Sequence, residues 1–359
     1  MRILWLNGRP ENNPGGTEQH TVDFIKALGK VERIELFLAV AKGSFADKNT
    51  ANFDRKVYVR FRSEFAPNST FKLIREARKI KPDIIVANNG NEYLNAFLAG
   101  QLSGAEVVLF RHMVARQPYL LKKLVFPRVK YILAVSDYVK EFLLKEEGVQ
   151  AKKVHVVYNF IDPEEFDFSQ VRRRNIREKY GIGKNEVVLL YCGKISKGKG
   201  IREFTEVYRN LRIRHRNLKA IVVGGGDMLR EIRENFRTDR NVLVTGPQNS
   251  AAEFFIASDI FLMPTRAKES FGRTIVEAFA TKTAVVASNI GNIPYLIRNG
   301  VNGYLAEVGD VRSMTNLVDK LIQDGNIRKK LQEEGYKDYL TRFHRDIVLT
   351  KFLKLIGQA

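Results

Sequence analysis

The chain contains two successive series of short apolar runs, each run of strand length and each followed by a stretch with helical patterning. The first series extends from residues 2–6 to residues 130–135, and the second from residues 187–191 to residues 284–287. Runs of Val, Ile and Leu without polar alternation indicate parallel strands that are covered on both faces. Two such series predict an α/β protein with two doubly wound, Rossmann-like domains that face each other across a cleft.

A polar and charged segment, residues 163–177, separates the two series. We therefore expect an N-terminal domain over residues 1–165, a C-terminal domain over residues 166–340, and a helix in residues 341–359 that packs back toward the N-terminal domain. A length of 359 residues suits two domains better than a single core.

The strongest anomaly of the composition is a formal net charge of +20. It implies an anionic partner: a phosphate-bearing substrate, an acidic membrane surface or nucleic acid. Nucleic acid would require basic residues interleaved with exposed aromatic residues along a groove. The aromatic residues here lie mostly within apolar runs, which favours the core, so we do not expect nucleic acid as a partner.

The sequence offers little for disulfides, metals or membrane spans. Cys192 is the single cysteine, and the five histidines lack metal-ligand spacing, so we expect neither a disulfide nor a metal site. No apolar run reaches the ~18 residues of a membrane span, and the first residues lack the pattern of a secretory signal. We therefore expect a cytoplasmic protein.

Gly15 and Gly16 lie between the first apolar run and the first expected helix. Glycine lets the backbone approach a ligand closely, and the helix N-terminus behind it offers free N–H groups to an anion. A plain tight turn would use the same residues, so both interpretations stay open.

A second glycine-rich loop, residues 191–200, follows the first strand of the second series and includes Gly193, Lys194, Lys197 and Lys199. Cations beside closely approaching backbone suit a diphosphate, although a solvated lysine loop is the alternative. The spacing is not that of a P-loop.

Gly224, Gly225 and Gly226 follow the next strand and invite a dinucleotide interpretation. The dinucleotide fingerprint fails because Leu229 occupies the third glycine position and the strand is not the first of its domain. A turn that lets a phosphate or a sugar approach is favoured over a nicotinamide cofactor.

Glu269 and Glu277 flank seven residues that include Phe271, Gly272 and Arg273. We expect a loop up to Gly272 and a helix from Arg273 onward. Two carboxylates with exposed amides between them could bind vicinal hydroxyls on either side of a diphosphate, with the helix N-terminus facing the anion. The alternative is an exposed glutamate followed by an ordinary helical one.

The order of these motifs resembles the family 4 glycosyltransferases of the GT-B fold, over nearly the whole chain. The matching features are Gly-Gly-x-Glu at Gly15, a histidine after a central strand (His112), Asn159-Phe-Ile-Asp162 with Phe166, Gly193-Lys194 with Lys199-Gly200, Gly224-Gly-Gly, Glu269-x7-Glu277, and Asn299 to Leu305.

The resemblance implies that the C-terminal domain binds a nucleoside diphosphate sugar and that the N-terminal domain faces the acceptor. Lys194 and Lys199 would hold the diphosphate, Glu269 would meet the donor sugar and Glu277 would bind the ribose hydroxyls. His112 would lie near the reacting sugar and the acceptor, a satisfied core histidine being the alternative. Further residues expected at the nucleotide-sugar site are Gly15, Gly16, Gly193, Gly224, Phe271, Gly272 and Arg273.

Four positions depart from the family pattern. Lys194 stands where arginine is usual and lacks the bidentate fork of that residue. Lys282 and Ala284 stand where Gly and Pro are usual, and Tyr295 replaces a common glutamate. These differences concern the shape of the donor pocket rather than the fold.

The resemblance further implies a retaining transfer by front-face attack, with no protein nucleophile, metal or cofactor. The departing phosphate oxygen would deprotonate the acceptor hydroxyl, and preorganised lysines would stabilise the leaving diphosphate. The donor would be UDP-, GDP- or ADP-linked, and the acceptor a glycan or lipid-linked molecule of cell-envelope polysaccharide or glycolipid synthesis. A sugar-nucleotide epimerase of GT-B-like fold, with an acid/base pair and no acceptor site, is the alternative.

Residues 118–130 add a membrane hypothesis, because Lys122 and Lys123 lie among leucines. Four apolar residues would share one face of a helix here: Leu120, Leu121, Leu124 and Val125. Basic residues beside an apolar stripe suit an anionic membrane, which predicts peripheral association at its inner face. A core-facing helix with a solvated lysine edge is the alternative, and a soluble anionic polysaccharide would explain the charge equally well.

Overall fold

The computed structural model describes residues 1–10 and 15–357, which belong to two compact units. Unit 1 comprises residues 1–160 together with residues 345–359, and unit 2 comprises residues 161–344. The chain thus leaves unit 1 at residue 160, where the sequence suggested 165, and returns to it for its last helix.

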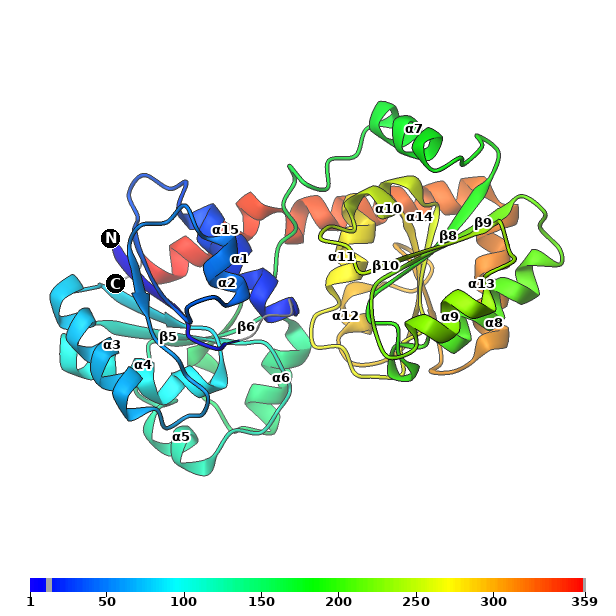
Figure 1. Ribbon diagram of the computed structural model, residues 1–359. Coiled ribbons are helices and arrows are strands. Elements are labelled where there is room, and N and C mark those ends of the chain that lie inside the picture. The colour runs from blue at the N-terminus through cyan, green and yellow to red at the C-terminus, as the bar shows by residue number, and fades with distance from the viewer. Residues whose placement is uncertain (11–14, 358–359) are drawn as a thin grey trace. The chain divides into compact units, whose positions relative to one another are not determined.

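Unit 1, whose β5 and β6 are labelled in Figure 1, is built on a parallel sheet. Its described strands run in the order β3-β2-β1-β4-β5-β6-β7. The strands are β1 Arg2–Asn7, β2 Glu35–Val40, β3 Lys56–Tyr58, β4 Ile84–Ala87, β5 Glu106–Arg111, β6 Tyr131–Ala134 and β7 Val154–Val156. The helices are α1 Gly16–Leu28, α2 Phe45–Asn49, α3 Pro67–Ile80, α4 Gly90–Ser103, α5 Tyr119–Leu124, α6 Asp137–Lys145 and α15 Arg345–Ile356, with a 3₁₀ turn at Ala151–Lys153. The strand order reverses between β1 and β4, and open α/β sheets bind ligands at the carboxyl ends of such strands.

An aromatic cluster forms the centre of unit 1. Trp5 of β1 is fully buried, and its ring centroid lies 5.6 Å from that of Phe24 and 5.7 Å from that of Phe110. Phe352 of α15 joins the cluster, 6.0 Å from Trp5. The last helix is therefore part of the core of unit 1.

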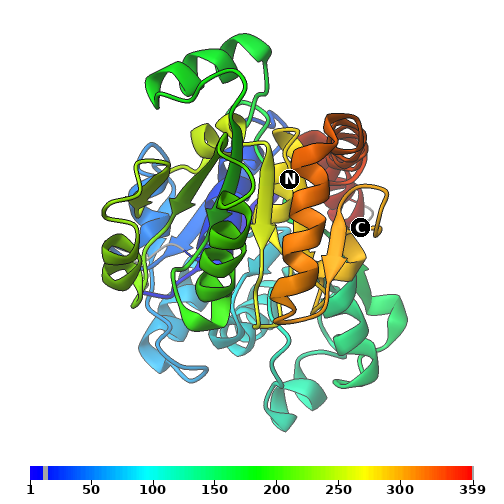
Figure 2. The same cartoon turned by 90° about the vertical axis from the view of Figure 1, so that its right-hand side faces the viewer.

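Unit 2 is built on a second parallel sheet of six strands, in the order β10-β9-β8-β11-β12-β13. The strands are β8 Val187–Cys192, β9 Leu218–Val223, β10 Val242–Gly246, β11 Ile260–Met263, β12 Ala284–Ser288 and β13 Tyr304–Ala306. The helices are α7 Gln170–Lys179, α8 Ile201–Arg212, α9 Leu229–Asn235, α10 Ala252–Ala257, α11 Arg273–Ala280, α12 Ile293–Leu296, α13 Val311–Gln323 and α14 Gly325–Asp338, with a 3₁₀ turn at Lys197–Lys199 and a π turn at Tyr339–Phe343. Here the order reverses between β8 and β11, and helices lie on both faces of the sheet (Figure 2). The two doubly wound, Rossmann-like domains predicted from the sequence are confirmed.

Part of the segment that separates the two apolar series is a helix of unit 2. Arg173 of α7 donates to the carbonyls of Ile256 and Ser258 at 2.6 and 2.7 Å, and both Arg173 and Arg177 pair with Asp259, at 2.7 and 3.2 Å. These contacts bind α7 to the turn before β11.

The helix within residues 118–130 is short, and its apolar face is divided between core and solvent. α5 ends at Leu124; Leu121 and Val125 are buried, whereas Leu120 is 62% and Leu124 41% exposed. The four residues lie within an arc of about 140° on a helix of 3.6 residues per turn, and only the edge with Leu120 and Leu124 is exposed to solvent.

Candidate functional site

The carboxyl ends of the strands in unit 2 gather most of the residues selected from the sequence. Gly193 and Lys194 follow β8, and Gly224 follows β9. The two turns are joined by the backbone, because the N–H of Gly193 donates to the carbonyl of Val223 at 3.0 Å. The turn after β9 is also tied to β10, where the N–H of Gly224 donates to Gly246 at 3.1 Å.

Close backbone packing explains why glycine occupies this turn. Gly224 has φ 135°, and a Cβ there would lie 1.9 Å from the carbonyl oxygen of Gly193. Gly226 has φ 156°, and its Cβ would lie 2.2 Å from the carbonyl oxygen of Ile195. The glycines after β9 therefore let this turn pack against residues 191–200, which we call the lysine loop. This role within unit 2 needs no bound dinucleotide.

The lysine loop is fastened in turn to the segment after β11. Gly200 has φ 78°, and a Cβ there would lie 1.8 Å from the carbonyl oxygen of Pro264. The N–H groups of Arg266 and Ala267 donate to the carbonyl of Gly198 at 3.0 and 3.1 Å. These two loops sit at the switch point between β8 and β11.

Lys199 and Glu269 meet at this switch point. The Lys199 ammonium contacts Oε1 of Glu269, with 34% of the lysine side chain and 17% of the glutamate side chain exposed. Beneath them, the hydroxyl of Tyr191 donates to the carbonyl of Lys194 at 2.8 Å, and burial raises the pKa of this tyrosine. The structure thus brings together the side chains that the resemblance assigned to the diphosphate and to the donor sugar. Lys194 is exposed beside them.

Helix α11 begins at Arg273, the residue expected from the sequence. Gly272 before it has φ 91°, in the left-handed region that favours glycine. Nε of Arg273 donates to Oε1 of Glu277 at 2.9 Å, and Glu277 is only 7% exposed. Glu277 is therefore a buried carboxylate paired within its helix, and Glu269, with 17% of its side chain exposed, is not the exposed glutamate of the alternative.

A loop that the sequence analysis did not select supports this glutamate motif. Asn292 donates from its backbone to the carbonyl of Glu269 at 2.8 Å and from Nδ2 to the carbonyl of Phe271 at 2.7 Å. Gly291, with φ 62°, leaves room for it, since a Cβ there would lie 2.6 Å from the Glu269 carbonyl oxygen. The Gly-Asn pair before Pro294 was the available signal, because glycine and asparagine mark turns.

In unit 1, Gly15 and Gly16 lie at the N-terminus of α1. Gly15 caps the helix, and its N–H donates to Oε2 of Glu18 at 3.1 Å. Both glycines are exposed, and a Cβ on Gly16 would meet no atom of the described residues within 4 Å. Asn13 and Pro14, which precede it in the motif, lie outside the described residues.

His112 follows β5 and is held by a polar network. Its Nε2 lies 3.2 Å from Oδ1 of Asn88, and its ring makes an edge contact with His20, with centroids 4.6 Å apart. Burial, aided by the charge of Arg111, lowers the pKa of His112 to about 3. A neutral imidazole therefore donates from Nε2 to Asn88, while Nδ2 of Asn88 contacts Thr21 of α1.

Glu92 joins the carboxyl ends of β1 and β4 next to this histidine. Its carboxylate accepts the N–H groups of Gly8, Asn88 and Asn89 at 2.7, 2.9 and 3.0 Å. Complete burial raises the pKa of Glu92 to about 6. This residue fixes the backbone from which Asn88 reaches His112.

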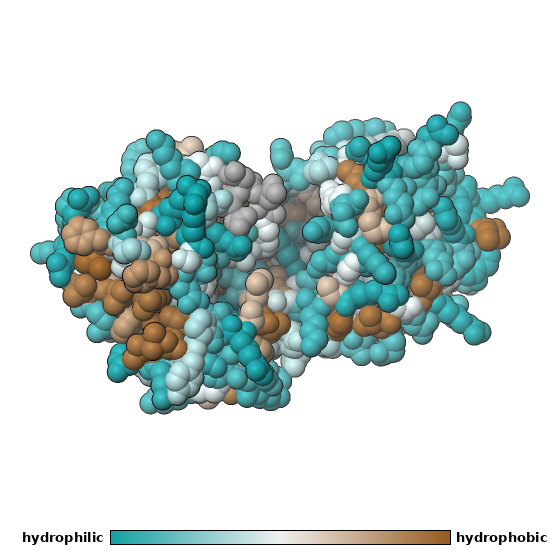
Figure 3. Space-filling view, turned by 60° about the horizontal axis from the view of Figure 1, so that its bottom comes forward, coloured by the Kyte–Doolittle hydropathy of each residue, from teal (hydrophilic) through white to brown (hydrophobic). Residues whose placement is uncertain are grey.

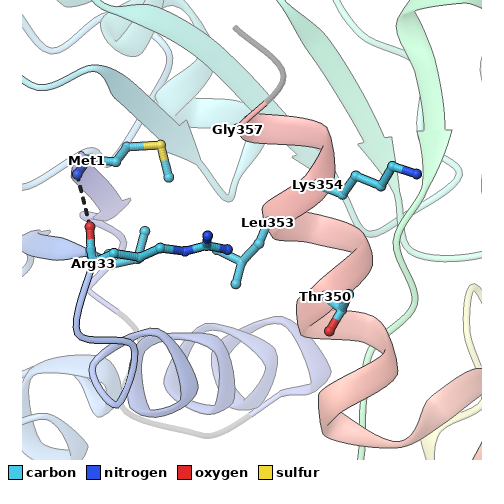
Figure 4. A pocket seen from close by; sticks show the side chains of 7 residues that line it. Met1, Arg33, Thr350, Leu353, Lys354 and Gly357 are labelled. Carbon is cyan, nitrogen blue, oxygen red and sulfur yellow. Dashed lines mark hydrogen bonds between the residues drawn. The ribbon is translucent and has the colours of Figure 1, made fainter.

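One large cavity of unit 1 lies away from these residues. A hollow of about 590 Å³ is lined by Met1 and Arg33 on one side and by Thr350, Leu353 and Lys354 of α15 on the other (Figure 4). It lies where β1 and β2 begin, at the amino edge of the sheet, whereas the residues selected from the sequence lie at the carboxyl edge.

Two family models match the chain, one on each unit. The model described as "Glycosyl transferases group 1" matches residues 172–338, and the model "Glycosyltransferase Family 4" matches residues 14–165. A relative from Bacillus anthracis, N-acetyl-alpha-D-glucosaminyl L-malate synthase, is 26% identical over 56% of this chain and 52% of its own. UDP-Gal:alpha-D-GlcNAc-diphosphoundecaprenol alpha-1,3-galactosyltransferase of Escherichia coli is 26% identical over 71% of this chain and 70% of its own. For several curated relatives, the match spans only about half to three fifths of their length.

Solved structures share the whole architecture. Anabaena Alr3699/HepE in complex with UDP-glucose aligns over 100% of both chains, with a TM-score of 0.81 and 21% identity. A glycosyltransferase from Rickettsia africae aligns over 99% of this chain and 98% of its own, with a TM-score of 0.85 and 22% identity. These likenesses confirm the GT-B fold with its two Rossmann-like domains.

Proposed function

Since this chain belongs to the GT-B glycosyltransferases, we propose that it transfers a sugar from a nucleoside diphosphate sugar to an acceptor hydroxyl, with retention of the anomeric configuration. The observation that carries the proposal is the edge of unit 2, where Lys199 meets Glu269 and Arg273 pairs with Glu277 at the start of α11. Cations, carboxylates and a helix N-terminus at one switch point suit a diphosphate flanked by two sugars.

The reaction breaks the bond between the anomeric carbon and the diphosphate oxygen and forms one to the acceptor oxygen on the same face. The acceptor proton passes to the departing phosphate oxygen, so no protein nucleophile is required. Lys199 and the exposed Lys194 stabilise the charge that develops on the leaving diphosphate, which is the largest contribution a preorganised site can make. Neutral His112 positions groups at the reacting sugar rather than acting as an acid.

A uridine nucleotide is the first donor to test, with guanosine and adenosine nucleotides beside it. HepE was solved with UDP and with UDP-glucose, and the Escherichia coli relative is named for UDP-Gal. The printed names of relatives also include a diphosphoundecaprenol-linked sugar and a capsular polysaccharide enzyme, which supports a role in cell-envelope polysaccharide or glycolipid synthesis.

NMR of the first-formed product tests the proposal. The chain is incubated with UDP-, GDP- and ADP-sugars and a panel of glycan and lipid-linked acceptors, and the anomeric coupling of the new linkage is read. The proposal expects the donor's configuration to be kept. An inverted linkage would overturn the mechanism, and conversion of the donor sugar without any acceptor would favour an epimerase.

For a lipid-linked acceptor, we propose that unit 1 contacts an anionic membrane surface from the cytoplasmic side. Among the described residues, no helix is long and apolar enough to cross a membrane. Hydrophobic side chains gather on one face of unit 1 in Figure 3. The large apolar residues most exposed on this unit are Phe65, Phe71, Met113, Tyr119 and Leu120. Lys123 lies 4.8 Å from the ring centroid of Tyr119, so α5 offers both apolar and basic groups.

Vesicle sedimentation tests this contact. The wild type should sediment with acidic vesicles and less so as salt screens the charges. The double variant Leu120→Glu/Lys123→Glu should stay in solution, whereas Ile213→Glu, which changes an 84% exposed residue of unit 2, should sediment like the wild type. No sedimentation with acidic vesicles at low salt would remove the membrane from the proposal.

A further inference from the structure

A second pocket of unit 1 lies at the carboxyl edge of the sheet, beside β2 and β3. It has a volume of about 400 Å³, and the residues that matter here are Lys42, Ser44, Tyr58, Arg60 and Ser69. None of these side chains belongs to the motifs selected from the sequence. The pocket lies at the same edge as Gly15 and His112, where a parallel sheet offers its ligand sites.

The backbone around the pocket is firmly held. The hydroxyl of Ser69, in the first turn of α3, accepts from the N–H of Arg60 at 3.1 Å and donates to its carbonyl at 3.0 Å. On the other side, the hydroxyl of Ser44 caps α2 by accepting from the N–H of Asp47 at 3.3 Å. Arg60 and Lys42 thus extend from fixed backbone positions.

The two cations of the pocket are exposed, and no ion pair or side-chain hydrogen bond joins either of them to another described residue. The nearby acid Asp47 is already engaged, because Oδ1 pairs with Lys56 at 2.9 Å and Oδ2 accepts from the N–H of Gly43 at 2.9 Å. Lys42 also attracts Asp47, but no acid is among the described residues that line the pocket. Two exposed cations around such a concave surface attract an anion, and phosphate or carboxylate groups bind such cations most strongly.

Tyr58 adds an aromatic surface next to these cations. It is the last residue of β3 and 41% exposed, and no described residue makes a hydrogen bond to its hydroxyl. An exposed ring with a polar tip can cover the apolar face of a sugar and bond one of its hydroxyls. The combination fits a sugar that carries an anionic group better than a simple anion.

The strand order sets the distance to the reacting group. β2 lies three strands and β3 four strands from β5, which precedes His112. With neighbouring strands about 4.8 Å apart, the pocket lies roughly 14–19 Å along the sheet from that strand. A group bound there would belong to a part of the acceptor remote from its reacting hydroxyl.

We propose that this pocket is an acceptor subsite that binds a phosphate- or carboxylate-bearing sugar through Lys42, Arg60 and Tyr58. The inference rests on the proposed function, since it names the acceptor class of the same transferase. Binding energy from a remote anionic group would hold the acceptor for transfer, as interactions away from the reacting centre do in many enzymes. Binding of an anionic acceptor would also account for part of the net charge of +20.

NMR titration of the full chain tests the proposal with glucose 1-phosphate, methyl glucuronide and methyl glucoside as probes. The amides of Gly43, Ser44 and Arg60 should shift with at least one of the two anionic sugars, and the neutral glucoside should bind at least ~10-fold more weakly. The tighter of the two anionic probes identifies phosphate or carboxylate as the acceptor group. Equal binding of the neutral glucoside, or no shift with either anionic sugar, would overturn the proposal.

Variants make the assignment specific. Lys42→Ala and Arg60→Ala should each weaken the anionic sugar ~10-fold. Their matched controls, Lys48→Ala and Arg62→Ala, change exposed cations outside the lining residues and should bind like the wild type. Unchanged affinity in both pocket variants, or an equal loss in the controls, would contradict the assignment.

Two further readouts separate the remaining outcomes. Tyr58→Ala should weaken glucose 1-phosphate but leave inorganic phosphate unaffected; if it changes neither, the site takes a simple anion and the acceptor assignment falls. UDP affinity should be the same in all of these variants. Probe binding without any UDP, GDP or ADP binding would count against the transferase itself, whereas UDP binding without probe binding would sink only this inference.

Discussion

The two sheets present their carboxyl edges in different ways. In unit 2 the carboxyl edge is tightly packed and its charges are paired. Glycines allow close contact between backbone segments, Lys199 pairs with Glu269, and Arg273 pairs with Glu277. In unit 1 the described part of the edge is less tightly packed: a Cβ on Gly16 would meet no described atom within 4 Å, and the exposed Lys42 and Arg60 form no ion pair with a described residue. Such a difference is expected if unit 2 holds a common donor rigidly and unit 1 adapts to a particular acceptor.

The largest effect on turnover should come from replacing Lys199 at the carboxyl edge of unit 2. Lys199→Ala removes the cation that we propose stabilises the leaving diphosphate, and it should lower kcat by about 10²–10³-fold, as loss of one transition-state stabiliser does. Steady-state kinetics measure it, with Lys184→Ala as an exposed-lysine control in the same unit. A loss of less than about tenfold in a folded variant would mean that another cation carries the role.

A pair of glycine variants tests the contrast between packed and open backbone. Gly224→Ala should destabilise unit 2 by about 3 kcal/mol, because its Cβ would lie 1.9 Å from the Gly193 carbonyl oxygen and its φ is 135°. Gly16→Ala should change the stability of unit 1 by less than about 1 kcal/mol. Hydrogen exchange measured separately for the two units gives both changes in stability. Equal losses of stability in the two variants would contradict the contrast between packed and open backbone.

The polar network of unit 1 predicts a pH dependence. The folded pKa of His112, about 3, lies below the ordinary 6.5, so the unfolded state binds more protons between these values and stability falls as pH decreases. Between pH 7 and pH 5, His112 should lower the free energy of unfolding by about 2 kcal/mol. Glu92 partly offsets this loss, because its raised pKa of about 6 means that the folded state binds more protons than the unfolded state over this range.

Hydrogen exchange of β4 and β5 at both pH values measures this loss in unit 1. His112→Gln should make the stability less sensitive to pH by about the same 2 kcal/mol, since glutamine does not titrate. A variant that loses as much stability as the wild type on acidification would show that His112 is not held neutral.

A small stabilisation is expected where this chain departs from its family. Lys282 has φ 51°, a left-handed conformation that costs most side chains about 1–2 kcal/mol, which explains why glycine is usual there. Lys282→Gly would remove that strain. It would also lose the part-exposed pair with Glu333 at 3.0 Å and the contact of the ammonium with the Tyr336 ring at 4.7 Å, which together contribute about 1 kcal/mol. Thermal unfolding should show a gain of about 0.5 kcal/mol, and a clear loss would mean that the ion pair matters more.

The sequence predicted the long buried strands of both units, since continuous apolar runs report burial on both faces. It did not predict β3, β7 and β13, which are three residues long and too short for a pattern. The sequence analysis treated residues 163–177 as a segment between the domains and did not predict α7. The ion pairs of Arg173 and Arg177 that hold this helix are made with Asp259, which is distant in the sequence.

The same limit applies to the site. The glutamate and lysine motifs could be selected from the sequence because the residues of each motif lie close together along the chain. The supports, Asn88, Glu92 and Asn292, act through contacts that only the folded chain creates. Lys42 and Arg60 are surface cations among 60 lysines and arginines, and no local pattern distinguishes them.

The most direct test of the central claim, that unit 2 binds the donor nucleotide, is calorimetry of UDP, GDP and ADP with the wild type and with Glu277→Gln. One nucleoside diphosphate should bind the wild type. The variant should bind it about tenfold or more weakly, because the charge-assisted bond that we propose between the buried Glu277 and the ribose would be lost. Equal affinity in a correctly folded variant, or no binding of any of the three nucleotides, would contradict the account.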